Sequence, residues 1–411
     1  MKRTFIVTII LLSFSGVTVF AQSIDMSYYT EEYTRPTGTF FTRLELLETV
    51  RDANLTGIGE FYHSALRLLL SRVPDIRNRD EYNAAEDSAR IIAQALGEEK
   101  YIEAAPDLWV LAQTYDVIRS VNSGLVMQDA LIALGQMGAT DFVTHIALRL
   151  DNFNTDITND LETRRRVQRG VVGAIRALEI LQDPAGFRPV FFASIGWYEI
   201  SIRTMASVAL PNIMEDPGEI ISAIIRDSSI NPRAKYEAWR EMLRTHAPDS
   251  SKASVAAVAL ATGWNYSTSN PDNQRFLRDM RLSALETIRT LGIVDNSVYA
   301  NLEKSYKNNF ITVAPDYDEI RRTLAVLASA QSDEGTALLV SFLRDLNLRR
   351  RNGPWGARER QVLQILVPAV GATGVPSQEA VQLLNVIARS TDYTVAEQGW
   401  ARDALRALNQ S

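Results

Sequence analysis

Apolar residues recur at intervals of three and four along most of this chain, the spacing that places them on one face of an α-helix. Runs such as 81–99 (EYNAAEDSARIIAQALGEE), 125–138 (LVMQDALIALGQMG) and 276–292 (FLRDMRLSALETIRTLG) keep this period and carry Ala or another small residue near their centre. Small residues there would let neighbouring helices approach closely. Each run is followed by a short turn and a second, shorter apolar run. The pattern therefore predicts an all-α protein built from helix pairs.

An Asp or Ser precedes the second run of each pair at a nearly regular spacing. A side-chain oxygen at the N-cap accepts hydrogen bonds from the free amides of the first turn, and a carboxylate there also faces the positive end of the helix dipole. The steps between these residues, about 33 to 46 positions, lie in or near the range of two-helix repeats. We therefore expect helix caps at Asp107, Asp141, Asp183, Asp216, Asp249, Asp295, Asp333 and Ser377.

Three segments resemble HEAT repeats most closely: 127–141 (MQDALIALGQMGATD), 170–184 (GVVGAIRALEILQDP) and 278–292 (RDMRLSALETIRTLG). The family pattern is a helix with central Ala and Leu, a small residue near the turn, and Asp before the second helix. The resemblance covers residues 82–409 and, more weakly, 40–80. It implies a right-handed α-solenoid of about eight helix pairs that binds other macromolecules along its concave face or its loops.

The chain divides into four segments on this interpretation. Residues 1–21 have the charged start, apolar centre and small-residue cleavage site of a signal peptide, and residues 22–38 are expected to form an irregular arm. Residues 39–81 would form an N-terminal capping helix pair. Residues 82–411 would form the repeat solenoid, with a capping helix at the C-terminus.

The N-terminal segment predicts an exported protein, periplasmic or secreted. The alternative is an uncleaved membrane anchor, but the apolar run is shorter than the roughly 20 residues that a span requires. No later segment is long and apolar enough to cross a bilayer. The absence of cysteine fits a bacterial periplasm better than a disulfide-rich exterior, and it excludes thiol catalysis and Cys-ligated zinc.

Composition and motifs give little sign of catalysis. The net charge of −6 argues against a nucleic-acid partner, because phosphate binding needs a positive excess. The three histidines, His63, His145 and His246, lie far apart in the sequence, and the common nucleotide, zinc-protease and serine-hydrolase motifs do not occur. We therefore expect no cofactor, no metal and no catalytic residue.

The longer steps between repeats carry extra residues in one topological place, between a second helix and the next first helix. These segments, 151–166, 263–275, 307–319 and 347–360, should emerge along one rim, and arginine and aromatic residues gather in them. Both types are enriched at binding hot spots. The predicted partner-binding residues are Arg164, Arg165, Arg166, Trp264, Tyr266, Arg349, Arg350, Arg351 and Trp355. In the alternative interpretation, the arginines only pair with nearby acidic residues in a solvated, mixed-charge surface.

The predicted function is that of an exported scaffold, which binds a protein or another envelope component through its concave face and this rim. An anionic glycan is a second ligand that the rim arginines would suit. One alternative is a helical-toroid enzyme acting on envelope polysaccharide, with carboxylates such as Asp316 and Asp318 and the rim aromatics. Another is a structural part of an envelope assembly.

Overall fold

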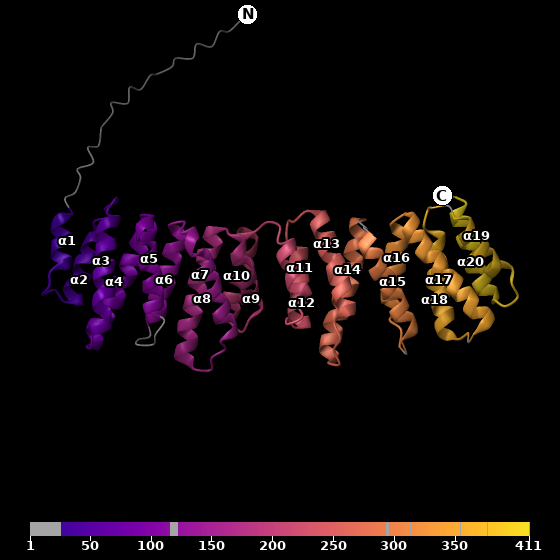
Figure 1. The fold of residues 1–411 in the computed structure, drawn as a ribbon, viewed down its shortest axis with the longest axis horizontal. Coiled ribbons are helices and arrows are strands. Elements are labelled where there is room, and N and C mark those ends of the chain that lie inside the picture. The colour runs from indigo at the N-terminus through magenta and orange to yellow at the C-terminus, as the bar shows by residue number, and fades with distance from the viewer. Residues whose placement is uncertain are drawn as a thin grey trace, which may run out of the picture.

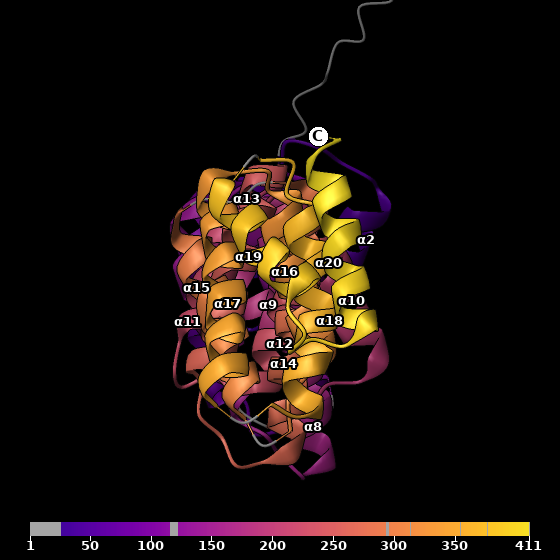
Figure 2. The same cartoon turned by 90° about the vertical axis from the view of Figure 1, so that its right-hand side faces the viewer.

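The computed structural model describes residues 26–115, 122–292, 296–312, 314–353, 355–375 and 377–410. Over these ranges the chain is all-helical and contains no strand. The helices lie side by side in chain order along the long axis of an elongated molecule (Figure 1). The end-on view separates two layers, with α11, α15 and α17 on one side and α2, α10 and α20 on the other (Figure 2).

The even-numbered helices form one layer. They are α2 (Phe40–Asp52), α4 (Arg79–Glu98), α6 (Ser123–Gln136), α8 (Leu161–Leu181), α10 (Ile200–Ile213), α12 (Pro232–Arg244), α14 (Pro271–Leu291), α16 (Tyr317–Ser329), α18 (Ala357–Gly371) and α20 (Val395–Leu408).

The odd-numbered helices form the other layer. They are α1 (Ser27–Thr34), α3 (Gly59–Arg72), α5 (Ala105–Thr114), α7 (Val143–Thr155), α9 (Phe187–Ile195), α11 (Gly218–Arg226), α13 (Asp249–Asn265), α15 (Asn296–Ile311), α17 (Asp333–Asn352) and α19 (Gln378–Arg389). From α3 onward, each odd-numbered helix packs against the even-numbered helix that follows it.

Small residues, some within the helices and some near their C-terminal ends, allow neighbouring helices to pack closely. A Cβ atom on Gly135 of α6 would lie 2.8 Å from the Cα atom of Ala177 on α8, and one on Gly173 would lie 2.8 Å from the Cα atom of Gln128. A side chain at either glycine would therefore push α6 and α8 apart. A Cβ atom on Gly371 of α18 would lie at the same distance from the Cα atom of Ala404 on α20.

Packing between successive pairs thins at one place. Elsewhere neighbouring pairs meet through their even-numbered helices, as in α8 against α10 and α12 against α14. Between the α9/α10 pair and the α11/α12 pair, α10 and α12 pack little against each other, and α9 against α12 is the main contact. The array therefore consists of an N-terminal block, α1 to α10, and a C-terminal block, α11 to α20.

The turns from α7 to α8, α13 to α14, α15 to α16 and α17 to α18 lie along one edge, the lower one in Figure 1. We call this the junction edge. The expectation of long loops there is wrong, because helices take up most of the extra residues: α7 ends at Thr155 and α8 already begins at Leu161. Strong N-caps such as Asp160, which accepts a hydrogen bond from the Thr163 amide at 2.8 Å, start the following helices early.

The N-terminal arm contains a helix that was not expected. Residues 27–34 form α1, which is fixed by the buried Tyr33: its ring packs edge-on against Phe61, and its carbonyl accepts a hydrogen bond from Arg43 Nε at 2.9 Å. The proposed signal peptide, residues 1–21, lies outside the described residues. No helix in the described ranges is both long enough and apolar enough to cross a membrane.

The predicted caps are only partly right. Side chains of Asp183, Asp216 and Ser377 accept amide hydrogen bonds at helix starts, at 2.8, 3.0 and 3.2 Å. Asp295 lies outside the described residues, and the remaining predicted caps lie within the first turn instead: Asp107, Asp141, Asp249 and Asp333. Inside the first turn they still face the positive end of the dipole. The even-numbered helices have the more regular caps, at Asn78, Asp160, Asn231, Asn270 and Asp316.

Candidate functional site

Several of the arginine and aromatic residues predicted to dock a partner make cation–π contacts within the chain, along the junction edge. Arg350 lies over the rings of Trp355 and Tyr393, with its guanidinium carbon 5.0 and 5.6 Å from the ring centroids. Arg349 lies 4.7 Å from the ring centroid of Phe310. These are intramolecular cation–π contacts, so much of the side-chain surface of Arg350 and Trp355 is already covered.

The other predicted docking residues occupy two further places along the same edge. At the start of α8, Arg164 lies over the ring of Trp197 at 5.7 Å, and Arg165 forms an exposed ion pair with Glu162 at 3.5 Å. Burial lowers the pKa of Arg166 from its ordinary value.

At the end of α13, Trp264 and Tyr266 each meet a cation of the chain itself. The guanidinium carbon of Arg281 lies 4.2 Å from the Trp264 ring centroid, and Lys235 Nζ lies 5.6 Å from that of Tyr266. The structure therefore brings Arg350 and Trp355 into contact, and it places the predicted residues at three separate turns.

A buried ion pair behind Trp264 was not predicted. Arg281 of α14 donates to both carboxylate oxygens of Glu319 on α16, at 2.9 and 3.0 Å, and to the carbonyl of Gly263 at 2.9 Å. Glu319 is fully buried, and its carboxylate also accepts a hydrogen bond from Ser305. Arg281 therefore links α13, α14 and α16 behind the junction edge.

The carboxylates considered for catalysis are also paired within the fold. Asp316 caps α16 and accepts a charge-assisted hydrogen bond from Arg278. Burial alone would raise the pKa of Asp316, but the hydrogen bonds from Arg278 and from the Glu319 amide hold that pKa below its ordinary value. Asp318 pairs with Arg321 and Arg322. A glycosidase needs a carboxylic acid with a raised pKa as proton donor, which Asp316 does not supply.

His63 has a polar partner that its place in the sequence did not suggest. Its Nε2 atom lies 2.8 Å from Asp107 Oδ2, which also accepts a hydrogen bond from Arg67 Nε at 3.1 Å. The cluster joins α3 to α5, and His63 is 7% exposed. In the described part of the chain, no three His, Cys, Asp or Glu residues gather in a way that could hold a metal ion.

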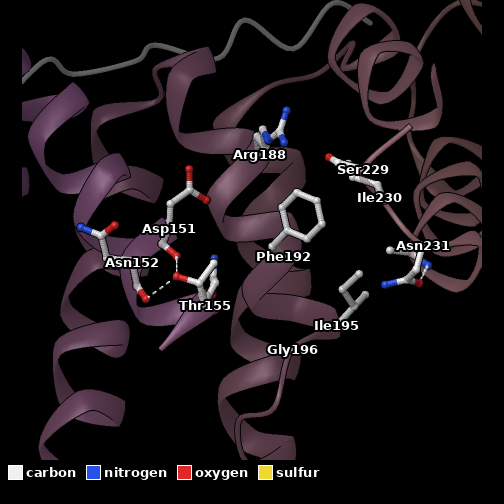
Figure 3. Close-up of a pocket in the computed structure, with 12 residues that line it drawn as sticks. Asp151, Asn152, Thr155, Arg188, Phe192, Ile195, Gly196, Ser229, Ile230 and Asn231 are labelled. Carbon is white, nitrogen blue, oxygen red and sulfur yellow. Dashed lines mark hydrogen bonds between the residues drawn. The ribbon is translucent and has the colours of Figure 1, made fainter. Parts of the chain in front are cut away.

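A hollow of about 550 Å³ lies where the two blocks meet, and we call it the central pocket (Figure 3). One wall consists of α7 and α9, and the other consists of the turn from α11 to α12 together with the start of α12. Phe192 points into the space between the walls, with Ile195 below it and Ile230 opposite. Polar groups surround this apolar centre: Asp151, Asn152, Asn154, Thr155, Arg188, Ser229 and Asn231.

Each wall of the central pocket is fixed by its own hydrogen bonds. On the α7 side, Asn154 donates to the Pro189 carbonyl at 2.9 Å and accepts from the Tyr198 hydroxyl at 3.0 Å. On the opposite side, Lys235 is fully buried and donates to the carbonyls of Ile225 and Asp227. Two preformed walls with sparse packing between them make a cleft rather than a packed core.

One ion pair bridges the two walls. Arg188 of α9 lies 3.5 Å from Asp227, and both side chains are partly exposed. Hydrogen bonds from Ser229 lower the pKa of Asp227. Burial raises the pKa of Asp151, against the opposing effect of Arg188. The pocket lining thus combines an apolar floor with one cation, Arg188, and one carboxylate, Asp151.

No protein-family model matches this chain, and no curated protein matches it. The HEAT-like assignment therefore stays a prediction from the repeat pattern.

The central pocket could not be located from the sequence. Its residues come from three separated segments, and each reads as an ordinary helix face or turn. The one local signal is Asp227-Ser228-Ser229, a polar turn next to the α12 cap at Asn231.

Proposed function

We propose that this chain is an exported, right-handed HEAT-like α-solenoid that acts as a binding scaffold and holds a segment of a protein partner in the central pocket. The observation that carries the proposal is the position of this pocket. It opens beside the α9–α12 contact, at the interface where successive pairs pack least, and the partly exposed Phe192 lies between its preformed polar walls. An apolar centre with a polar rim is the usual anatomy of a protein-binding site.

The two-layer arrangement supports the solenoid part of the proposal. Helices follow one another along a single axis and contact mainly their sequence neighbours, which is the property that defines repeat arrays. Export rests on the N-terminal sequence alone. An enzymatic role is the weaker alternative, because the carboxylate group around Asp316 is engaged by arginines.

The test is site-specific photo-crosslinking in cells that produce the protein. A photoreactive residue replaces Asn152, an exposed side chain on the pocket wall, and a matched probe replaces Asp403, an exposed residue of α20. We expect one discrete adduct from position 152 and none from position 403. The adduct should disappear when Thr155→Trp fills the pocket from the end of α7.

Three results would contradict the proposal. They are the absence of any adduct at position 152, the same adduct at both positions, and an adduct that survives Thr155→Trp in a variant whose helix content and unfolding temperature are unchanged.

A further inference from the structure

A second hollow, also of about 550 Å³, lies between the end of α17 and α19, and we call it the C-terminal pocket. Three arginines line it, Arg350, Arg351 and Arg389, against one carboxylate, Asp392. The chain as a whole carries a net charge of −6, so this positive excess runs against the general composition. The pocket is therefore suited to a negatively charged ligand.

The three guanidinium groups differ in how they are held. Arg350 stacks over the rings of Trp355 and Tyr393, and it donates to the backbone carbonyl of Asp392. It is therefore fixed in place before any ligand arrives. Arg351 and Arg389 have no ion pair with a carboxylate in the described part of the chain, and Arg351 is exposed.

The neutral side chains of the pocket offer groups that match a peptide backbone. The side-chain NH₂ of Asn385 donates to the carbonyl of Val381 at 2.9 Å, so its oxygen is the atom that would accept from a peptide N–H. Gln382 lines the same hollow one helical turn earlier. An amide side chain can both donate to and accept from a peptide group, whereas the arginines only donate.

We propose that the C-terminal pocket binds an acidic peptide segment, with Asp or Glu carboxylates on Arg351 and Arg389 and with the peptide backbone on Gln382 and Asn385. This inference rests on the proposed scaffold function, for which it supplies a second contact with the same class of partner. Guanidinium groups bind carboxylates through paired hydrogen bonds, and Arg350 supplies a third positive charge already oriented by the aromatic rings. In this proposal, the stacking of Arg350 on Trp355 orients the Arg350 guanidinium group in the pocket, and Trp355 itself does not contact the partner.

The experiment measures fluorescence anisotropy of a labelled hexaglutamate peptide titrated with residues 22–411 at low salt. We expect saturable binding that weakens as salt rises, because exposed charge pairs are screened. The double variant Arg351→Gln/Arg389→Gln should weaken binding by about tenfold or more. The control is Arg275→Gln/Arg406→Gln, which removes the same charge from two exposed sites elsewhere and should leave the affinity within about twofold.

Several results would overturn the inference. Failure of hexaglutamate to bind is one, and equal weakening by both double variants is another, because it would mean a general electrostatic attraction. Tighter binding of a tetragalacturonate of similar charge density would make the ligand an anionic glycan. Complete displacement of the peptide by millimolar inorganic phosphate would mean that the ligand of the C-terminal pocket is a small anion.

Failure of this inference can be told apart from failure of the proposed function. If a partner crosslinks at position 152 but hexaglutamate does not bind, only the C-terminal pocket is misassigned. If hexaglutamate binds as expected but no partner crosslinks at position 152, only the central pocket is misassigned. Thr155→Trp should leave hexaglutamate binding unchanged in either case.

Discussion

Replacing Arg281 by methionine should destabilise the C-terminal block strongly. The side chain of Arg281 is 12% exposed and that of Glu319 is 0% exposed, so the variant leaves a buried carboxylate without its counter-ion. Removing one partner of a buried ion pair costs about 3–5 kcal/mol. The hydrogen bond from Ser305 to Glu319 remains, which places the expected loss toward about 3 kcal/mol. The lost stacking on Trp264 adds to this cost.

The assay is urea unfolding followed by circular dichroism. The loss of stability should appear in the unfolding transition of the C-terminal block, because each repeat in such an array contacts and stabilises mainly the repeats next to it. The matched control is Arg289→Met, which breaks an exposed ion pair with Glu286 and should cost less than about 1 kcal/mol.

A double variant, Arg281→Met with Glu319→Leu, separates the ion pair from simple packing. Replacing both charges by apolar groups removes the unpaired carboxylate, so most of the lost stability should return. If Arg281→Met costs no more than Arg289→Met, or if the double variant is less stable than Arg281→Met alone, the assignment of Arg281 as the link between α13, α14 and α16 is wrong.

Three further predictions concern packing, charge and the continuity of the array. Gly173→Val should lower the unfolding temperature, because its Cβ atom would lie 2.8 Å from the Gln128 Cα atom. The control, Gly399→Ala, has open space around it and should be neutral or slightly stabilising. Equal effects of the two variants on the unfolding temperature would contradict the packing argument. Asp151→Asn should raise the unfolding temperature at pH 7. Because the pKa of Asp151 is raised in the fold, its contribution to stability is full below about pH 4 and is lost as the pH rises. The difference in unfolding temperature between variant and wild type should therefore vanish near pH 3. A difference that persists at pH 3 would refute the effect assigned to Asp151. Deleting residues 377–411 should lower the unfolding temperature without abolishing folding, since α19 and α20 cover α17 and α18; unchanged unfolding would argue against a continuous array.

The helices could be predicted from the sequence because their apolar period is strong. A C-terminal capping helix was expected, and the structure has α20 there. The helices over 82–411 follow in the expected order, but the pairing is offset by one, because each expected second helix packs more against the next first helix than against its own expected partner, as α9 does against α10. The apolar residues keep their spacing of three and four because each helix buries one face in the middle of the array. Helix ends were less well placed, since polar residues such as those after Leu161 extend a helix as readily as they form a loop.

Side-chain partners over long sequence distances were the part that could not be predicted. The rim arginines were recognised, but the aromatic rings beneath them come from other segments: Arg164 meets Trp197, and Arg349 meets Phe310. Asp107 looked like a cap, yet it pairs with Arg67 and contacts His63 on a different helix. Such contacts depend on how neighbouring helix pairs pack against each other. The spacing of apolar residues within one helix carries no information about that packing.

The thin packing between α10 and α12 is a further feature that the period conceals. The sequence over 199–246 repeats like its neighbours, and nothing in it marks the change. The interruption becomes visible only when the interfaces between helices are compared, and the central pocket lies at the same junction between the two blocks.

The measurement that tests the central claim most directly is quantitative capture of the partner after crosslinking in cells that produce the protein. It compares the ratio of partner to bait for the wild-type chain, for Thr155→Trp in the central pocket, and for Asp403→Trp on α20 as a control. The account predicts a near-stoichiometric partner with wild type and with the control, and at least an about tenfold loss with Thr155→Trp. Equal capture by all three folded proteins, or no partner with wild type, would contradict a scaffold that works through the central pocket.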